Sequence, residues 1–142
     1  MKVVINRCYG GFGISPEAQE LYLKYCGKKC YFYKQTKYEH CDGKVEYMRV
    51  PTKEATSWCY TVTKNLGKTT TDIGGDNESE LWYDGNIERD DPILIRVVEE
   101  LGSDKASNSH AKLEIVEIPD GIEYTIDDYD GRESIHEAHR SW

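Results

Sequence analysis

Two segments of the sequence begin with a helix-capping residue followed by proline and end at a glycine. The first runs from Ser15 to Gly27 and the second from Asp91 to Gly102. Serine and aspartate side chains accept hydrogen bonds from the first helical turn, proline fits the first helical position, and glycine ends a helix readily. Within both segments apolar residues recur three and four positions apart, which gives each helix one apolar face. The sequence therefore predicts two helices that lie far apart in the chain.

The segments outside these helices are rich in aromatic and β-branched residues, as is typical of β-strands. Predicted strands cover residues 2–6, 30–33, 44–50, 56–64, 112–118 and 122–126. The Asp42–Gly43 dipeptide predicts a hairpin between the second and third of these strands, and the turn at Pro119 predicts another between the last two.

Two further segments carry weaker signals. Residues 69–80 contain almost no apolar side chain, so we expect an exposed loop there. The residues after Gly131 are predicted to form one or two helical turns, with Ile135 as their apolar contact. Hairpin signals occur together with two capped helices, and regular βαβ alternation is missing. The predicted fold class is therefore α+β, an antiparallel sheet packed with two main helices in a single domain that spans residues 1–142.

The charge of the chain limits its partners. It has 18 Lys and Arg residues against 26 Asp and Glu residues, a net charge of −8. Duplex nucleic acid is bound mainly through Lys and Arg, so no nucleic-acid polymer is expected as a partner. A small phosphorylated ligand remains compatible, because it needs only a few positive groups and backbone N–H donors.

The cysteines point to a reducing compartment. No signal peptide follows Met1 and no apolar stretch could span a bilayer, so we expect a cytosolic protein without a membrane partner. The five cysteines are then interpreted as reduced thiols. Cys26, Cys30, His40 and Cys41 offer soft ligands for zinc, but their positions hamper convergence on one tetrahedron. We therefore predict no metal and no cofactor.

Gly10, Gly11 and Phe12 lie in a glycine-rich loop between a predicted strand and the first predicted helix. Such a loop can present free N–H groups and a positive helix dipole to a phosphate. The sequence lacks both the dinucleotide fingerprint and the Gly-Lys-Ser/Thr ending of phosphate-binding loops. The alternative is a sharp turn whose glycines allow positive φ while Tyr9 and Phe12 pack inward.

The acidic tail contains residue types that metallohydrolases use: Asp127, Asp128, Asp130, His136, Glu137 and His139. Its HEAH sequence misses the zincin spacing by one residue, so the aspartates are better interpreted as a solvated turn. His136, His139 and Arg140 lie close to Trp142, a combination that suits a phosphate and a base. A frayed surface tail is the alternative. No nucleophile stands out, so no catalytic residue is predicted.

Four stretches of the chain together resemble a family of small phage-encoded proteins, the Thoeris anti-defence sponges of the first-described type. These stretches are MKVVINRCYGGFGIS, RDDPILIRVVEELG, KLEIVEIPDGIEY and DDYDGRESIHEAHRSW, spread from Met1 to Trp142. The resemblance implies a catalytically inert protein of the host cytoplasm that captures glycocyclic ADP-ribose, a signal made by bacterial TIR-domain enzymes, without cleaving it. It also implies that the ligand lies between two protomers, and that dimers assemble into hexamers that bind cyclic trinucleotides.

The resemblance and the residue types together suggest a ligand site. A sponge must supply donors for a pyrophosphate, an aromatic surface for adenine, and enough enclosure to slow escape. We predict that this site contains Gly10, Gly11, Phe12, Trp82, Asp91, Asn108, Arg132 and Arg140. Trp82, or its neighbour Tyr83, is expected to stack on the base, Asp91 and Asn108 to bind ribose or base, and the two arginines to bind phosphate. Lys24 and Arg89 are candidates for a second, oligomer-dependent anion site.

Two other functions would use different residues. A nucleotide-processing enzyme such as a phosphodiesterase would use His136, His139 and the aspartates of the tail. A protein-interaction module would use the acidic, tyrosine-rich surface.

Overall fold

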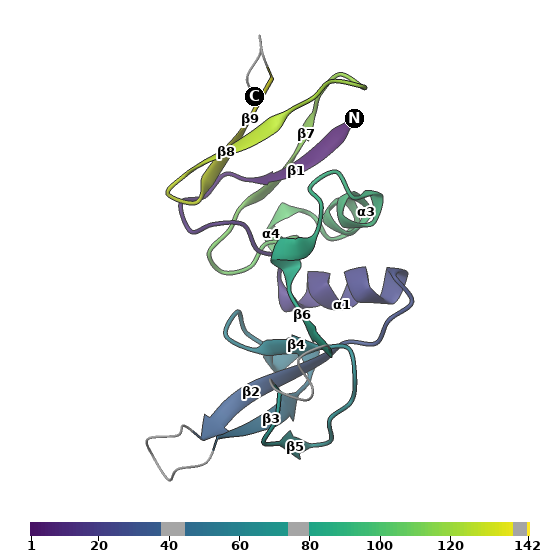
Figure 1. Cartoon of the computed structure of the whole chain (residues 1–142), viewed down its shortest axis with the longest axis vertical. Helices are drawn as coiled ribbons and strands as arrows, with labels where there is room; N and C mark the ends of the chain where they lie inside the picture. Colours follow the sequence, from purple (N-terminus) through teal and green to yellow (C-terminus); the bar gives the residue numbers. More distant parts are fainter. Residues whose placement is uncertain (38–44, 74–79, 138–141) are drawn as a thin grey trace.

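A computed structural model of the chain describes residues 1–37, 45–73, 80–137 and 142. These residues form three antiparallel sheets and the helices between them, stacked along the long axis of an elongated molecule (Figure 1). At one end β1 (Lys2–Asn6) pairs with β7 (Leu113–Glu117), and β8 (Thr125–Tyr129) pairs with β9 (Arg132–His136). At the other end is a five-stranded sheet of order β5-β3-β2-β4-β6. Its strands are β2 (Tyr31–Lys37), β3 (Glu46–Val50), β4 (Tyr60–Val62), β5 (Thr69–Thr70) and β6 (Leu81–Trp82). The α+β class is confirmed, with three sheets in place of one.

Both predicted helices are confirmed. They are α1 (Pro16–Tyr25) and α3 (Pro92–Leu101), capped by the Ser15 hydroxyl and the Asp91 carboxylate. Glycines with positive φ follow both helices, as their sequence predicts. A short helix that was not predicted, α4 (Ser103–Ala106), follows α3, and the 3-10 turns η1 (Thr52–Glu54) and η3 (Asp84–Asn86) precede β4 and α3. Within the described ranges no helix has the length and apolar content needed to cross a bilayer.

Two local predictions are wrong. Residues 112–118 do not form a hairpin with residues 122–126, because β7 pairs along its whole length with β1. The residues after Gly131 form strand β9 instead of helical turns. Asp130 and Gly131, both with positive φ, form the two-residue turn that joins β8 to β9. An Asp–Gly dipeptide is a strong hairpin signal, and it outweighs the helical spacing of the few apolar residues that follow.

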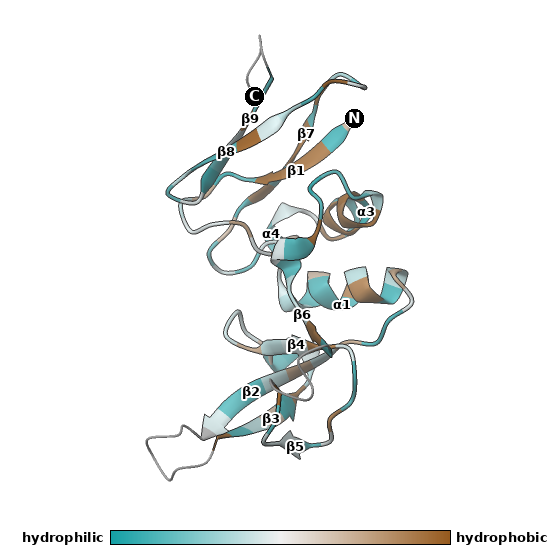
Figure 2. Cartoon of the chain, in the orientation of Figure 1, coloured by the Kyte–Doolittle hydropathy of each residue, from teal (hydrophilic) through white to brown (hydrophobic). Residues whose placement is uncertain are grey.

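The main core lies between α1, α3 and the β1–β7 pair. Figure 2 shows apolar residues of β1 and α3 in brown, and Val4 of β1 belongs to one core cluster with three buried residues of α3: Leu94, Val97 and Val98. Helix α1 packs on α3 and α4, and both of these helices contact β7. A smaller core, on the face of the five-stranded sheet turned away from α1, contains Tyr33, Val62 and Ile73. Ile73 is fully buried although it belongs to the segment predicted as an exposed loop.

Helix α1 also covers the middle of one face of the five-stranded sheet. The strand register places four side chains in one row across this face: Val50, Phe32, Thr61 and Trp82. Gln19 of α1 accepts a hydrogen bond from the Thr61 hydroxyl, and the adjacent Glu20 accepts one from Thr52. Two hollows therefore lie on either side of α1, one toward β6 and one toward β3.

Candidate functional site

The hollow toward β6 is the strongest candidate for a ligand site. It has a volume of about 350 Å³, within the range typical of small-molecule sites. Five aromatic side chains from three separate segments line it: Phe12, Trp58, Tyr60, Trp82 and Tyr83. We call it the aromatic cleft. The hollow toward β3 is larger, about 740 Å³, but none of the sequence-predicted site residues lines it.

Three residues predicted from the sequence meet in the aromatic cleft. Phe12 comes from the glycine loop, Trp82 from β6 and Asn108 from the loop before β7, and all three line the same hollow. Tyr83, the predicted alternative to Trp82, lines it as well. The fold therefore brings together side chains that are far apart in the sequence.

Tyr22 of α1 packs against Trp82, and Asp91 at the start of α3 holds Tyr22 in place. The ring of Tyr22 lies 5.7 Å from that of Trp82 with an interplanar angle of 36°. The Tyr22 hydroxyl donates a 2.6 Å hydrogen bond to Oδ2 of Asp91, whose Oδ1 accepts the capping bond from the Ile93 N–H. Burial, together with the Asp91 carboxylate, raises the pKa of Tyr22, so this hydroxyl stays a donor.

Asp91 has a structural role in addition to the one predicted for it. Each of its carboxylate oxygens accepts one hydrogen bond, Oδ1 at the cap of α3 and Oδ2 from Tyr22. Each oxygen can accept a second hydrogen bond, so binding of ribose or base by Asp91 stays a prediction. Asp91 supports the wall of the cleft, and it is not among the residues that line the cleft.

The Phe12 wall is backed by an ion pair. The guanidinium of Arg89 lies 3.6 Å from the centroid of the Phe12 ring. Its two terminal nitrogens bond both oxygens of Glu133, at 2.5 and 2.8 Å, and the Glu133 side chain is only 5% exposed. An anion at Arg89 would have to compete with this bidentate carboxylate. Lys24, the other predicted residue of a second anion site, is exposed in the last turn of α1, and no described contact joins it to Arg89.

Three backbone donors around the start of α1 are already paired. The N–H of Ile14 donates to Oδ2 of Asp84 at 2.9 Å, and the N–H of Ser15 donates to the carbonyl of Ala106 at 2.8 Å. The N–H of Ala18 donates to the Ser15 hydroxyl. A phosphate at this helix end would meet these three occupied donors and the Asp84 carboxylate. The N–H groups of the glycine loop itself are a separate set, so ligand binding by Gly10 and Gly11 stays a prediction.

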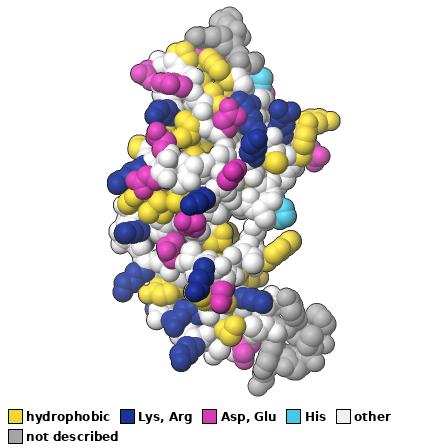
Figure 3. Space-filling model, turned by 180° about the vertical axis from the view of Figure 1, so that it is seen from behind, with side chains coloured by type: hydrophobic (Ala, Val, Ile, Leu, Met, Phe, Trp, Pro, Cys, Tyr) yellow, Lys and Arg dark blue, Asp and Glu magenta, His cyan; other side chains and the backbone are white. Residues whose placement is uncertain are grey.

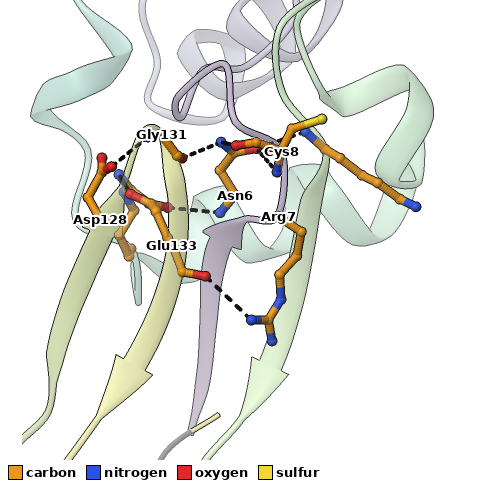
Figure 4. Close-up of polar contacts among 8 residues, drawn as sticks. Asn6, Arg7, Cys8, Asp128, Gly131 and Glu133 are labelled. Carbon is orange, nitrogen blue, oxygen red and sulfur yellow. Dashed lines mark hydrogen bonds and ion pairs between the residues drawn. The ribbon is translucent and has the colours of Figure 1, made fainter.

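Gly10 and Gly11 are explained by different backbone constraints. A Cβ on Gly10 would lie 2.1 Å from the carbonyl oxygen of His110, whereas Gly11 has a positive φ of 93° that other residues rarely adopt. The hairpin turn also packs closely on this loop, because a Cβ on Gly131 would lie 2.4 Å from the Gly11 nitrogen. Asn6 connects the start of the glycine loop to the β8–β9 turn, because its Nδ2 donates to the carbonyls of Cys8 and Gly131, both at 2.7 Å (Figure 4). Gly10 and Gly11 fix the loop against its neighbours, while Phe12 alone of the three predicted loop residues lines the cleft.

The polar groups of the aromatic cleft are mostly fixed by the protein. Gln19 uses its carbonyl for Thr61 and its amide for the Ile14 carbonyl. Asn108 accepts from the His110 N–H at 2.9 Å through Oδ1, which leaves its Nδ2 as a donor without a partner among the described residues. The described lining contains no Lys or Arg and one carboxylate, that of Asp84. Its chemistry suits a flat, uncharged ring rather than a phosphate.

The predicted phosphate ligands lie elsewhere. Arg132 is exposed at the start of β9, with its guanidinium 5.9 Å from the Tyr9 ring. Arg140 lies outside the described residues. Trp142 exchanges backbone hydrogen bonds with Ile135 and packs against the core between β1 and β9, at the far end from the five-stranded sheet (Figure 1). Lys and Arg are also not gathered in one patch on the face shown in Figure 3, where acidic side chains alternate with them.

Some of the residues weighed for metal binding or hydrolysis pair with neighbours in the β8–β9 hairpin. His136 Nε2 lies 3.2 Å from Asp127 and 2.8 Å from the Ser134 hydroxyl, and Asp128 accepts from the Gly131 N–H in the hairpin turn. Cys26 is exposed and Cys30 is half-buried, whereas His40, Cys41 and His139 lie outside the described residues. Within the ranges that the structure covers, no three His, Cys, Asp or Glu side chains are grouped for a metal ion.

The cysteines should differ sharply in reactivity. Burial, together with Glu20, raises the pKa of the Cys30 thiol to about 12, while Cys8 and Cys26 are exposed. Because only the thiolate reacts, a higher pKa means slower alkylation at every pH below it. Iodoacetamide at pH 8 should label Cys8 and Cys26 first, with Cys30 slower by roughly a hundredfold or more. Peptide mass spectrometry over a time course measures this, and equal rates for Cys30 and Cys26 would contradict the buried position of Cys30.

Some residues of the cleft had only a weak signal in the sequence. Trp58 and Tyr60 belong to a predicted strand, yet Trp58 is 83% exposed in the loop before β4. The exposure of Trp58, which is seen only in the structure, indicates that this loop borders a site. Asp84 and Tyr22 gave no signal, because their roles depend on contacts with Ile14 and Asp91 that only the fold creates.

Comparison of the chain with protein-family models, curated proteins and solved structures gives no match.

Proposed function

We propose that this chain is a phage anti-defence protein that binds and sequesters a cyclic nucleotide signal, glycocyclic ADP-ribose made by TIR-domain enzymes, without cleaving it. The supporting observation is the aromatic cleft, where the predicted residues Phe12, Trp82 and Asn108 lie together in a hollow of suitable size. In this proposal the cleft holds the adenine base, and the protein acts by lowering the free concentration of the signal in the host cytoplasm.

The chemistry of the lining favours the base, and not the pyrophosphate, as the part of the ligand inside the cleft. Aromatic side chains stack on a nucleobase and contribute about 1–3 kcal/mol per base. Nδ2 of Asn108, which has no partner among the described residues, can donate to a ring nitrogen on the edge of adenine. Asp84 brings negative charge to the lining, which disfavours a phosphate inside the cleft. The pyrophosphate therefore extends out of the cleft.

The phosphates then need cations from outside the cleft. Arg132 and Arg140 remain the proposed phosphate ligands, and a second copy of the chain is the proposed means of bringing them to the cleft. The proposed assembly is a homodimer that can extend to a hexamer, with Lys24 and the Arg89 region at the site for cyclic trinucleotides. Competition from Glu133 makes Arg89 the weaker member of that pair.

One assay separates capture from degradation. The purified protein is incubated with glycocyclic ADP-ribose and passed through a filter, and the retained fraction is then denatured by heat. The signal should disappear from the filtrate and return unchanged on heating, as chromatography with mass detection would show. Altered ligand would support the alternative, a phosphodiesterase-like enzyme that degrades the signal. No depletion before heating would reject nucleotide binding and favour a protein-interaction module.

A further inference from the structure

We infer that Tyr22 and Asp91 are positioning residues that set the orientation of Trp82 in the aromatic cleft, so that the affinity for a base depends on a hydrogen bond the ligand does not touch. The inference rests on the proposed function only for its effect on affinity. Its structural part, the control of the Trp82 ring, is testable without any ligand.

The contacts form a continuous path from helix α3 to the cleft. Asp91 is fixed at the start of α3 because its Oδ1 accepts from the Ile93 N–H at 2.8 Å. Its Oδ2 accepts from the Tyr22 hydroxyl at 2.6 Å, which fixes the rotation of the Tyr22 side chain on α1. The Tyr22 ring is 9% exposed and lies against the ring of Trp82, 5.7 Å between centroids.

Trp82 depends on this support because its own strand is short. β6 contains only Leu81 and Trp82, and it pairs with β4 at the edge of the sheet. A ring at an edge strand keeps one orientation only if packing on its far side restricts its side-chain torsions. Tyr22 supplies this packing, so a ligand that stacks on Trp82 meets a surface already in place and loses less entropy on binding.

The chain contains a matched control on the same helix. Tyr25 lies three residues after Tyr22 on α1, and its hydroxyl donates a hydrogen bond of the same length, 2.6 Å, to Glu100 of α3. That pair is exposed, and Tyr25 does not touch Trp82. Tyr22→Phe and Tyr25→Phe therefore remove the same chemical group from the same helix, but only the first removes a contact behind the cleft.

The direct test is ¹⁹F NMR of protein labelled with 5-fluorotryptophan, with the Trp82 signal assigned by a Trp82→Phe variant. In Tyr22→Phe the Trp82 signal should shift or broaden, while the Trp58 and Trp142 signals stay in place. Tyr25→Phe should leave all three signals unchanged. A Trp82 signal identical in Tyr22→Phe and in the unmodified protein would overturn the inference.

A second variant keeps the test informative if Tyr22→Phe folds poorly. Asp91→Ser retains a side chain that caps α3 but is too short to reach Tyr22, so it should shift the Trp82 signal in the same way. Calorimetric titration with glycocyclic ADP-ribose then measures affinity, and Tyr22→Phe should weaken it by about three- to tenfold. Unchanged affinity beside a shifted Trp82 signal would overturn the link to binding. If the unmodified protein fails to bind, the proposed function fails while the ¹⁹F result still decides the positioning role.

Discussion

Replacing Glu133 with alanine should lower the free energy of unfolding by about 3 kcal/mol, the largest loss expected from any single carboxylate among the described residues. Glu133 is 5% exposed and accepts three hydrogen bonds, two from the Arg89 guanidinium and one from the Asn6 N–H at 2.8 Å. Alanine would leave a half-buried guanidinium and a buried backbone N–H without partners. Breaking a buried ion pair costs more than the pair contributes, because the remaining charge is not solvated.

The chain also offers a control for this loss. Glu114 pairs with Arg7 at 2.9 Å, but its side chain is 54% exposed. Glu114→Ala should therefore change the stability by less than about 1 kcal/mol. Glu133→Gln should fall between the two, since it keeps one acceptor oxygen for the Asn6 N–H but loses the charge and the oxygen that accepts from the second Arg89 nitrogen. Urea unfolding followed by circular dichroism measures all three, and equal losses for Glu133→Ala and Glu114→Ala would mean that the Arg89 pair is not buried in solution.

Replacing Trp82 with alanine should weaken capture of glycocyclic ADP-ribose by about 2–3 kcal/mol, or roughly 30- to 150-fold in the dissociation constant. Trp82 provides the wall of the cleft that faces α1, and its loss removes both the stacking surface and the enclosure. Trp82→Phe keeps a smaller ring in contact with Tyr22, so it should lose less than half as much. Isothermal titration calorimetry at a temperature where each variant is folded gives these values.

The comparison needs an aromatic residue remote from the cleft. Tyr129 is 80% exposed beside the β8–β9 turn and does not line the aromatic cleft. Tyr129→Ala should leave the affinity unchanged. If Trp82→Ala and Tyr129→Ala bound the ligand equally well, the base would not occupy the cleft.

The helices could be predicted from the sequence because their signals are local. Each has a side-chain cap, a proline at its start and a glycine after its end, and the structure uses every one of these residues as expected. Strand pairing could not be predicted in the same way. The partner of β7 is β1, more than a hundred residues earlier in the chain, and the turn at Pro119 gives no indication of it.

For the site, the structure shows which of the predicted residues lie together. Trp82 was chosen for stacking, Asn108 for hydrogen bonds and Phe12 as part of the glycine loop, and all three line the cleft. Asp91 was chosen to bind ribose or base and Arg89 to bind an anion, and the fold pairs them with Tyr22 and Glu133. A sequence shows that a charged group exists, but the partner that neutralises it is decided by tertiary contacts.

The most direct test of nucleotide capture in the aromatic cleft is a ¹⁹F NMR titration of the 5-fluorotryptophan protein with glycocyclic ADP-ribose. The chain has three tryptophans, of which Trp58 and Trp82 line the cleft and Trp142 packs near Ile135 at the other end of the molecule. We expect the Trp58 and Trp82 signals to move to saturation while Trp142 stays fixed. Movement of Trp142 alone, or of no signal at all, would show that the base does not bind in this cleft.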